Sequence, residues 1–191
     1  MPDRLTLIAL KGIPLVKPGD DLIQLVANAI AENGEQLMNG DILVVAQKII
    51  SKSENCLVNI TDIEPSDRAR ELALEVDKDP RVVEMILSES RSIIRKKPGV
   101  LIVENKLGLI MANAGIDHSN VESQIPEQTL LLLPDDPDAS AERLRNEIRS
   151  QFSVDVGIIV NDSVGRPWRI GTMGLAIGIS GLPAVTDLRG D

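Results

Sequence analysis

The chain has 191 residues, of which 43% are hydrophobic, so it can bury a core as one domain or as two small lobes. Its net charge of −9 and its 1% aromatic content argue against broad binding to nucleic acid or to an anionic membrane, and against base stacking. A single cysteine, Cys56, and the lack of an apolar stretch near the roughly 20 residues of a membrane span predict a soluble, cytoplasmic protein.

In the first half of the chain, apolar periodicity predicts strands and helices in alternation. The predicted strands are Leu5–Leu10 and Ile42–Ala46. A helix capped by Asp20 separates them, and two more helices begin with caps at Ser66 and Asp79. These helices carry Leu, Ile, Val and Ala at helical spacing, so their apolar faces are expected in the core.

In the second half, the basic run 91–97 predicts a solvated helix end. A hairpin is expected next, with strands Val100–Glu104 and Leu109–Ala112, and a helix capped by Ser140 follows it. The β-branched run Val156–Val160 predicts a buried strand. The pattern as a whole predicts a mixed α/β (α+β) fold, with helices flanking a mixed sheet.

Polar residues and glycines directly follow the run Val156–Val160, which is typical of a functional strand end. Asp162 and Ser163 offer the hard oxygen ligands that Mg²⁺ or Mn²⁺ prefers. Arg166 and Arg169 supply guanidinium groups that match phosphate or carboxylate oxygens. The alternative is a strand, a turn and a second strand with a surface aspartate, because structural ion pairs give the same pattern.

Two other segments carry polar groups near strand ends. Asp117 is a candidate oxygen ligand and Asn120 a candidate reader of a nucleotide base, while His118 between them is either a general base or a structural residue. Lys48 and Lys52 follow the strand Ile42–Ala46 and are either anion ligands or solvated charges. Neither a dinucleotide-binding glycine fingerprint nor a Walker phosphate loop occurs, so a nucleotide would have to be bound by a different motif.

Several of these motifs, taken in order, closely resemble the coenzyme F420:L-glutamate ligase family. The resemblance rests on residues 113–121, 162–171 and 176–181, and extends to 12–16, 40–46 and 50–52. It implies a GTP-dependent enzyme that joins L-glutamate to coenzyme F420-0. It also implies a family-specific fold over residues 1–191, ending before a C-terminal segment of the family, and a homodimer.

The resemblance assigns roles to individual residues. Mg²⁺ or Mn²⁺, together with K⁺, would be the cofactors. Apart from the resemblance, charge considerations lead us to expect a fixed cation from Lys52 at the phosphates, and binding of a substrate carboxylate or phosphate by Arg166 or Arg169. The metal would be held by Asp117, Asp162 and Ser163, and the nucleotide by Ile13, Pro14, Leu15, Val16, Gln47, Lys48, Lys52 and Asn120.

Two other functions remain open on sequence grounds. The chain could be a non-catalytic nucleotide- or metal-binding fragment, or half of a split ligase that a partner completes. It could also be another metal-dependent phosphoryl-transfer enzyme, which would hydrolyse nucleotide without glutamate. None of the residues is a convincing general base.

Overall fold

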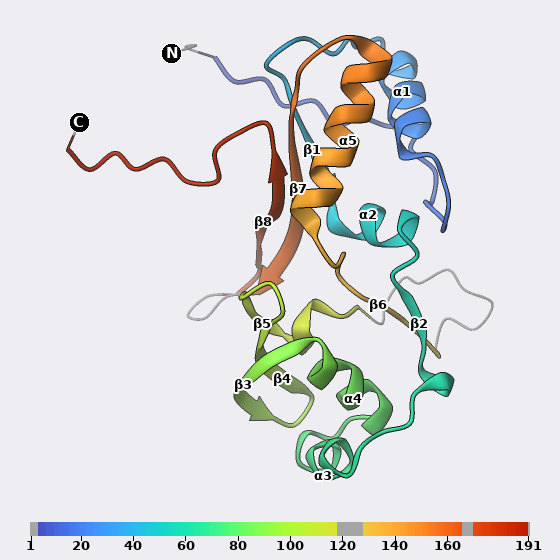
Figure 1. Cartoon of the computed structure of the whole chain (residues 1–191), viewed down its shortest axis with the longest axis vertical. Coiled ribbons are helices and arrows are strands. Elements are labelled where there is room, and N and C mark those ends of the chain that lie inside the picture. Colours follow the sequence, from blue (N-terminus) through green and yellow to red (C-terminus); the bar gives the residue numbers. More distant parts are fainter. Residues whose placement is uncertain (1–3, 118–127, 166–169, 191) are drawn as a thin grey trace. The chain divides into compact units, whose positions relative to one another are not determined.

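The computed structural model describes residues 4–117, 128–165 and 170–190, which divide into two compact units (Figure 1). Unit 1 comprises Met1–Asn55, Asp136–Asn161 and Ala176–Asp191. Unit 2 comprises Cys56–Asp135 and Asp162–Leu175. Helices and strands both contribute to each unit, so the predicted mixed α/β class is confirmed.

Unit 1 is built on a sheet in the order β1-β7-β8, with β1 (Ile42–Ala46) parallel to β7 (Gly157–Gly165) and β8 (Thr172–Ser180) beside β7. Figure 1 shows α5 (Pro137–Phe152) lying along this sheet, with α1 (Leu22–Glu32) next to it, and α2 (Gln47–Ser53) following β1 directly. The buried core between helices and sheet consists of Ile23, Val45, Ile50, Ala141, Leu144, Ile148, Val156, Ile158 and Val160.

Unit 2 holds two smaller sheets. The antiparallel sheet β3-β4-β5 consists of β3 (Ser90–Lys97), β4 (Val100–Asn105) and β5 (Ile110–Ala112). Helices α3 (Asp67–Val76) and α4 (Pro80–Ser88) pack on it, and β2 (Leu57–Asn59) pairs with β6 (Thr129–Leu131). Short 3₁₀ turns, η1 (Ile60–Asp62) and η2 (Asn113–Gly115), complete the unit.

Several predicted helix starts are confirmed by their caps. The Ser66 hydroxyl accepts a hydrogen bond from the Ala69 amide at 3.3 Å, and the Asp79 carboxylate accepts one from the Arg81 amide at 2.8 Å. Pro80 sits in the first turn of α4, where its missing N–H leaves no intrahelical bond unmade.

Two predicted caps are wrong by one to four residues. Asp21, not Asp20, caps α1 through the Gln24 amide, while Asp20 accepts from the Lys17 amide and closes the preceding turn. Asp136, not Ser140, caps α5. The Ser140 hydroxyl lies one turn inside the helix and donates to the Asp136 carbonyl, a local bond that serine often makes.

Other predicted elements differ in type. Residues 5–10, predicted as a strand, have no regular secondary structure. Residues 91–97, predicted as a helix end, belong to β3. This is an edge strand whose lysines and arginines are exposed, and charged side chains on an edge strand discourage pairing with other chains. The segment after Ile42–Ala46 forms a helix, α2. Within the described part of the chain, no helix has the length and apolar character needed to cross a bilayer.

Candidate functional site

Helix α2 divides the candidate residues that follow β1 into two faces. Gln47 and Ser51, one turn apart, are buried, and the Gln47 amide donates to the Ser51 hydroxyl at 2.9 Å. Lys48 and Lys52 are also one turn apart, are half-buried, and share another face of the helix. This geometry favours the two lysines over Gln47 as ligands for an anion, because the Gln47 amide is already used inside the unit.

The predicted nucleotide loop Ile13–Val16 also belongs to unit 1. Val16 is buried at 6% exposure, whereas Leu15 is 63% exposed and Pro14 is exposed as well. The loop is held by the turn that follows it, where the Gly19 amide donates to the Ser53 carbonyl at the end of α2. The loop and the lysine-bearing helix are therefore connected within one unit.

Asp162 and Ser163 lie inside β7 and not in the loop that the sequence suggests. The strand continues to Gly165 because the Asn161–Gly165 backbone stays extended beside β8, as in the strand–turn–strand alternative. The Asp162 carboxylate accepts a hydrogen bond from the Ser163 amide at 2.7 Å. Successive side chains of a strand face opposite sides, so Asp162 and the Ser163 hydroxyl point to different faces of β7.

Asp117 follows a turn with an uncommon backbone. Asn113, Ala114 and Gly115 all have positive φ values, of 51°, 58° and 79°, and the Asn113 side chain accepts from the Leu101 amide at 3.2 Å. Asp117 then pairs with Leu131 through two backbone hydrogen bonds of 2.9 and 2.8 Å. The backbone of Asp117 is thus held firmly in unit 2, the unit that also contains Asp162.

The oxygen donors of Asp117 and Asp162 fit the chemistry of Mg²⁺ or Mn²⁺, which are bound through one or two carboxylates together with water and phosphate oxygens. Among the residues that the structure describes, no three His, Cys, Asp or Glu side chains gather into a group able to hold a metal ion. A metal bound at these carboxylates would therefore need oxygen ligands beyond the side chains of the described residues.

Three predicted site residues, Asn120, Arg166 and Arg169, lie outside the described residues, as does His118. Their assignments stay predictions. The described candidates fall into two sets: the nucleotide candidates lie in unit 1, and the metal candidates in unit 2. The chain passes from one unit to the other inside β7, between Asn161 and Asp162.

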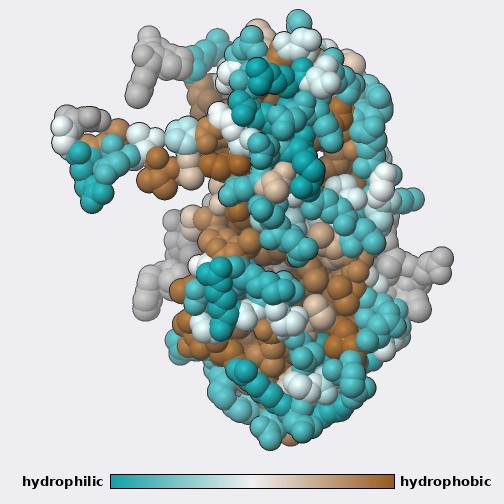
Figure 2. Space-filling model, in the orientation of Figure 1, coloured by the Kyte–Doolittle hydropathy of each residue, from teal (hydrophilic) through white to brown (hydrophobic). Residues whose placement is uncertain are grey.

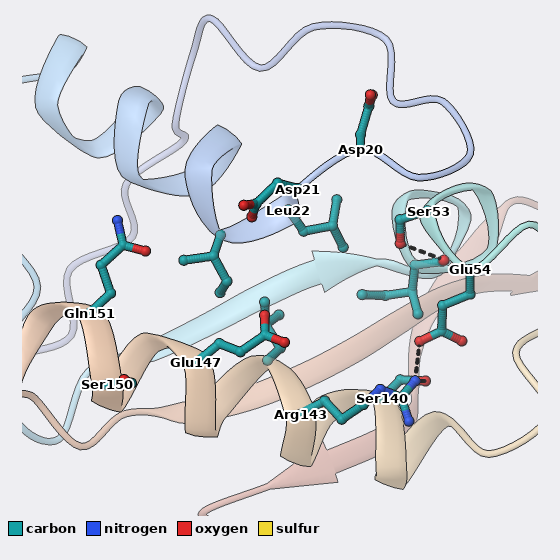
Figure 3. A pocket seen from close by; sticks show the side chains of 13 residues that line it. Asp20, Asp21, Leu22, Ser53, Glu54, Ser140, Arg143, Glu147, Ser150 and Gln151 are labelled. Carbon is teal, nitrogen blue, oxygen red and sulfur yellow. Dashed lines mark hydrogen bonds and ion pairs between the residues drawn. The ribbon is translucent and has the colours of Figure 1, made fainter.

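A hollow of about 520 Å³ in unit 1 was not foreseen from the sequence (Figure 3). Figure 3 shows side chains of α5 facing the start of α1 and the end of α2 across it. Its charged lining consists of Asp20, Asp21, Glu54, Glu147 and Arg143. Arg143 is already paired with Glu54, so the excess of carboxylates makes this hollow a poor site for a triphosphate.

The signal for this hollow is present in the sequence. Arg143 and Glu147 stand four residues apart, and therefore on one face of the helix, next to the packing positions Leu144 and Ile148. A charged face of a helix is usually solvated, so this spacing alone does not predict a hollow.

The fold and the candidate residues define a mixed α/β protein with lysines at one strand end and carboxylates on and near strands. The sequence profile of the F420-0:gamma-glutamyl ligase family matches residues 12–191. A coenzyme F420:L-glutamate ligase of Methanopyrus kandleri is 44% identical over 187 residues, which cover 96% of this chain and 71% of that protein.

Relatives of the same name show similar sequence identity and coverage. The protein of Methanothermobacter thermautotrophicus is 40% identical, with 98% of this chain and 73% of that protein covered. The protein of Archaeoglobus fulgidus is 41% identical, with 98% and 71% covered. The chain belongs to the F420-0:gamma-glutamyl ligase family, as its motifs predicted.

Proposed function

We propose that this protein is a GTP-dependent ligase that adds L-glutamate to coenzyme F420-0. The observation that carries the proposal is the family match over residues 12–191, which contains every candidate residue, together with relatives named coenzyme F420:L-glutamate ligase at 38–44% identity. A homodimer and the possible addition of further γ-linked glutamates belong to the same proposal.

The proposed reaction activates a carboxylate, which by itself is a poor electrophile. The coenzyme carboxylate attacks the γ-phosphorus of GTP, the bond to the bridging oxygen breaks, and GDP leaves. The glutamate nitrogen then attacks the carbonyl carbon of the acyl phosphate. Inorganic phosphate leaves, the amine loses a proton to phosphate or solvent, and an amide bond remains.

The anionic substrates would bring several negative charges together on a protein whose own net charge is −9, so the site needs cations. Lys48 and Lys52 would place two cations on one face of α2, beside the loop Ile13–Val16. Arg166 or Arg169 would bind a carboxylate or phosphate of the substrates. Asp117 and Asp162 would hold Mg²⁺ or Mn²⁺, which would neutralise charge on phosphate oxygens, and Ser163, whose hydroxyl faces the other side of β7 from Asp162, would bind a separate divalent cation. K⁺ would be a further cation.

The test is a ligation assay with the purified chain. GTP, coenzyme F420-0 and L-glutamate are incubated with Mg²⁺ or Mn²⁺ and K⁺, and the product is detected by its mass. The expected result is glutamylated coenzyme with release of one GDP per amide bond. Nucleotide binding without product would instead favour the non-catalytic fragment or half-site, and GTP hydrolysis that does not need glutamate would favour another phosphoryl-transfer enzyme.

The metal assignment has its own test in Asp162→Ala. This change removes a carboxylate without removing core volume, so product formation is expected to fall by at least 100-fold while the circular dichroism spectrum stays unchanged. Asp62→Ala, at an exposed aspartate of the same unit, is the matched control and should retain activity. A near wild-type rate for Asp162→Ala would remove the metal role.

The phosphate assignment is tested with Lys52→Ala. Loss of one charge-assisted contact costs roughly 1.5–3 kcal/mol, or about 10- to 150-fold in GTP affinity. Lys97→Ala, at an exposed lysine of β3, is the control. Equal GTP affinities of the two variants in calorimetry would contradict the assignment.

A further inference from the structure

A left-handed turn, residues 113–115, lies just before Asp117. Asn113, Ala114 and Gly115 have φ values of 51°, 58° and 79°, all in the left-handed region. Asparagine and glycine adopt this region more readily than other residues, whereas alanine is disfavoured there. A residue other than glycine keeps this conformation only where its surroundings impose it. The contacts around Asn113 identify those surroundings.

Asn113 stands where β5 leaves the antiparallel sheet. The register of β4 and β5 pairs Ile102 with Ala112, so Asn113 would lie opposite Leu101 if β5 continued. The backbone turns away at this point, and the Asn113 side-chain oxygen accepts a hydrogen bond from the Leu101 amide at 3.2 Å. Leu101 is fully buried, so its amide needs an acceptor. The side chain of Asn113 thus takes the place of the next backbone acceptor in the ladder.

Strand β5 has few contacts of its own to fix this point. It has three residues and lies at the edge of the sheet β3-β4-β5, and only Met111 in its middle is buried. Figure 2 shows hydrophobic surface in the part of unit 2 where Figure 1 labels β3, β4 and β5, and Ile110 of β5 is 65% exposed. Short, exposed edge elements open easily. The bond between Asn113 and Leu101 therefore adds a fixed contact where the chain leaves the sheet.

The other end of the segment is fixed as well. The Ile116 amide donates to the Asn113 carbonyl at 3.0 Å, which closes the turn. Asp117 then exchanges backbone hydrogen bonds of 2.9 and 2.8 Å with Leu131 of β6. Strands β4 and β6 belong to different sheets. The chain from Asn113 to Asp117 thus connects the two sheets of unit 2 and is hydrogen-bonded at both ends.

We propose that Asn113 is a positioning residue for the Asp117 carboxylate. Its side chain, bonded to the Leu101 amide, sets where the chain leaves β5, and the left-handed turn carries that position to Asp117. The inference rests on the metal role of Asp117 in the proposed function and adds the residue that determines where this ligand lies. Removal of a group that orients a metal ligand commonly weakens metal binding roughly 10- to 100-fold.

Two simpler roles of Asn113 lead to different expectations. If only the left-handed backbone mattered, glycine, which adopts it at no steric cost, would replace Asn113 without loss. If only the stability of unit 2 mattered, a substitution would lower the unfolding midpoint and leave the metal affinity of the folded protein unchanged. The proposal requires the side-chain oxygen, which Asn113→Gly removes and Asn113→Asp keeps.

The test measures the affinity for a non-hydrolysable GTP analogue by calorimetry, once with Mn²⁺ and once with EDTA. The ratio of the two dissociation constants reports the contribution of the metal, whereas a general loss of structure changes both constants. Wild-type protein is expected to bind more tightly with Mn²⁺. Asn113→Gly is expected to reduce the ratio roughly 10-fold, and Asn113→Asp, which tolerates the left-handed region, to stay within about 3-fold of the wild type.

Asp77→Ala is the matched control. Asp77 follows α3 in the same unit and has a φ of 50°, so alanine is disfavoured there and the change destabilises unit 2 outside the turn before Asp117. This variant should unfold at a lower urea concentration than the wild type and keep the wild-type ratio. A ratio that falls as far as that of Asn113→Gly would show a general effect of stability and would overturn the inference.

Asp117→Ala separates the inference from the proposed function. If this variant loses the effect of Mn²⁺ while Asn113→Gly keeps the wild-type ratio, the inference is overturned and the metal role of Asp117 stands. If Asp117→Ala keeps the wild-type ratio, or the wild type shows no effect of Mn²⁺, the metal role fails and the inference fails with it. An Asn113→Asp variant as weak as Asn113→Gly would also overturn the inference.

Ligation assays at increasing Mn²⁺ concentrations give a second readout. The Mn²⁺ concentration for half-maximal product formation is expected to rise roughly 10-fold in Asn113→Gly and to be restored in Asn113→Asp. A half-maximal concentration in Asn113→Gly equal to that of the wild type would contradict the positioning role.

Discussion

Gly178 of β8 lies so close to the start of α5 that a methyl group does not fit there. A Cβ atom at this position would lie 2.4 Å from both the carbonyl carbon and the carbonyl oxygen of Pro137, well inside van der Waals contact. The neighbouring amide of Ile179 donates to the Asp138 carboxylate at 2.7 Å, so β8 and α5 are joined at this point. The clashing atoms are backbone atoms of Pro137 in the first turn of α5. They cannot move away from Gly178 without breaking the hydrogen bond between Ile179 and Asp138.

Gly178→Ala is therefore expected to destabilise unit 1. Overpacking costs about 1–3 kcal/mol, and loss of a hydrogen bond to a charged acceptor adds about 1.5–3 kcal/mol. The expected total is roughly 3–5 kcal/mol, which lowers the urea midpoint of unfolding by on the order of 1–3 M.

Gly165→Ala is the matched control for this change. Gly165 also lies in a strand, β7, and no described atom lies within 4 Å of a Cβ placed there. The free energy of unfolding of this variant should stay within about 1 kcal/mol of the wild type, on the stabilising side, because alanine restricts the unfolded chain. Equal midpoints for the two variants in urea titrations followed by circular dichroism would refute the close contact between β8 and α5.

Further predictions concern unit 2. Ser66→Ala should destabilise it by roughly 1–3 kcal/mol in urea titrations, because Ser66 caps α3 and donates to Glu84 from its hydroxyl and amide at 2.6 and 2.8 Å. These hydrogen bonds lower the pKa of Glu84 below its ordinary value. Their contribution to stability is therefore complete above the ordinary pKa and is lost as the pH falls through the lowered pKa. Glu84→Gln should remove this part of the loss of stability in acid. Gly115→Ala should cost roughly 2–4 kcal/mol in urea titrations, because a positive φ and a Cβ 2.8 Å from a Leu133 side-chain atom both oppose it. Gly108→Ala, with a positive φ and only the flexible Arg91 side chain nearby, should cost about 1–2 kcal/mol in the same titrations.

The sequence predicted the elements whose local signals agree with their packing. Strand β1 has its predicted bounds, Ile42–Ala46, because a β-branched run bounded by a turn is buried on one face. Helices α3 and α4 begin at their predicted caps, Ser66 and Asp79. In these elements the periodicity, the cap and the burial all indicate the same structure.

The predictions failed where a tertiary partner decides the conformation. The basic run 91–97 resembles a helix end, yet it pairs with β4 over most of its length. Residues 5–10 have strand propensity but find no partner strand among the described residues of their own chain. Propensity for a strand is in large part propensity to pack against a neighbour, so sequence alone could not decide either segment.

The sequence named the candidate site residues, whose roles stay predictions, but it did not indicate that they fall into two compact units. Chain order placed Asp162 two residues after the buried strand Val156–Val160, which suggested one rim of one sheet. The structure extends the strand through Asp162, with the boundary of the two compact units just before it. A single extended strand thus carries core residues of unit 1 at one end and the candidate metal ligand at the other. Any change that alters the register of β7 must therefore move the Asp162 carboxylate.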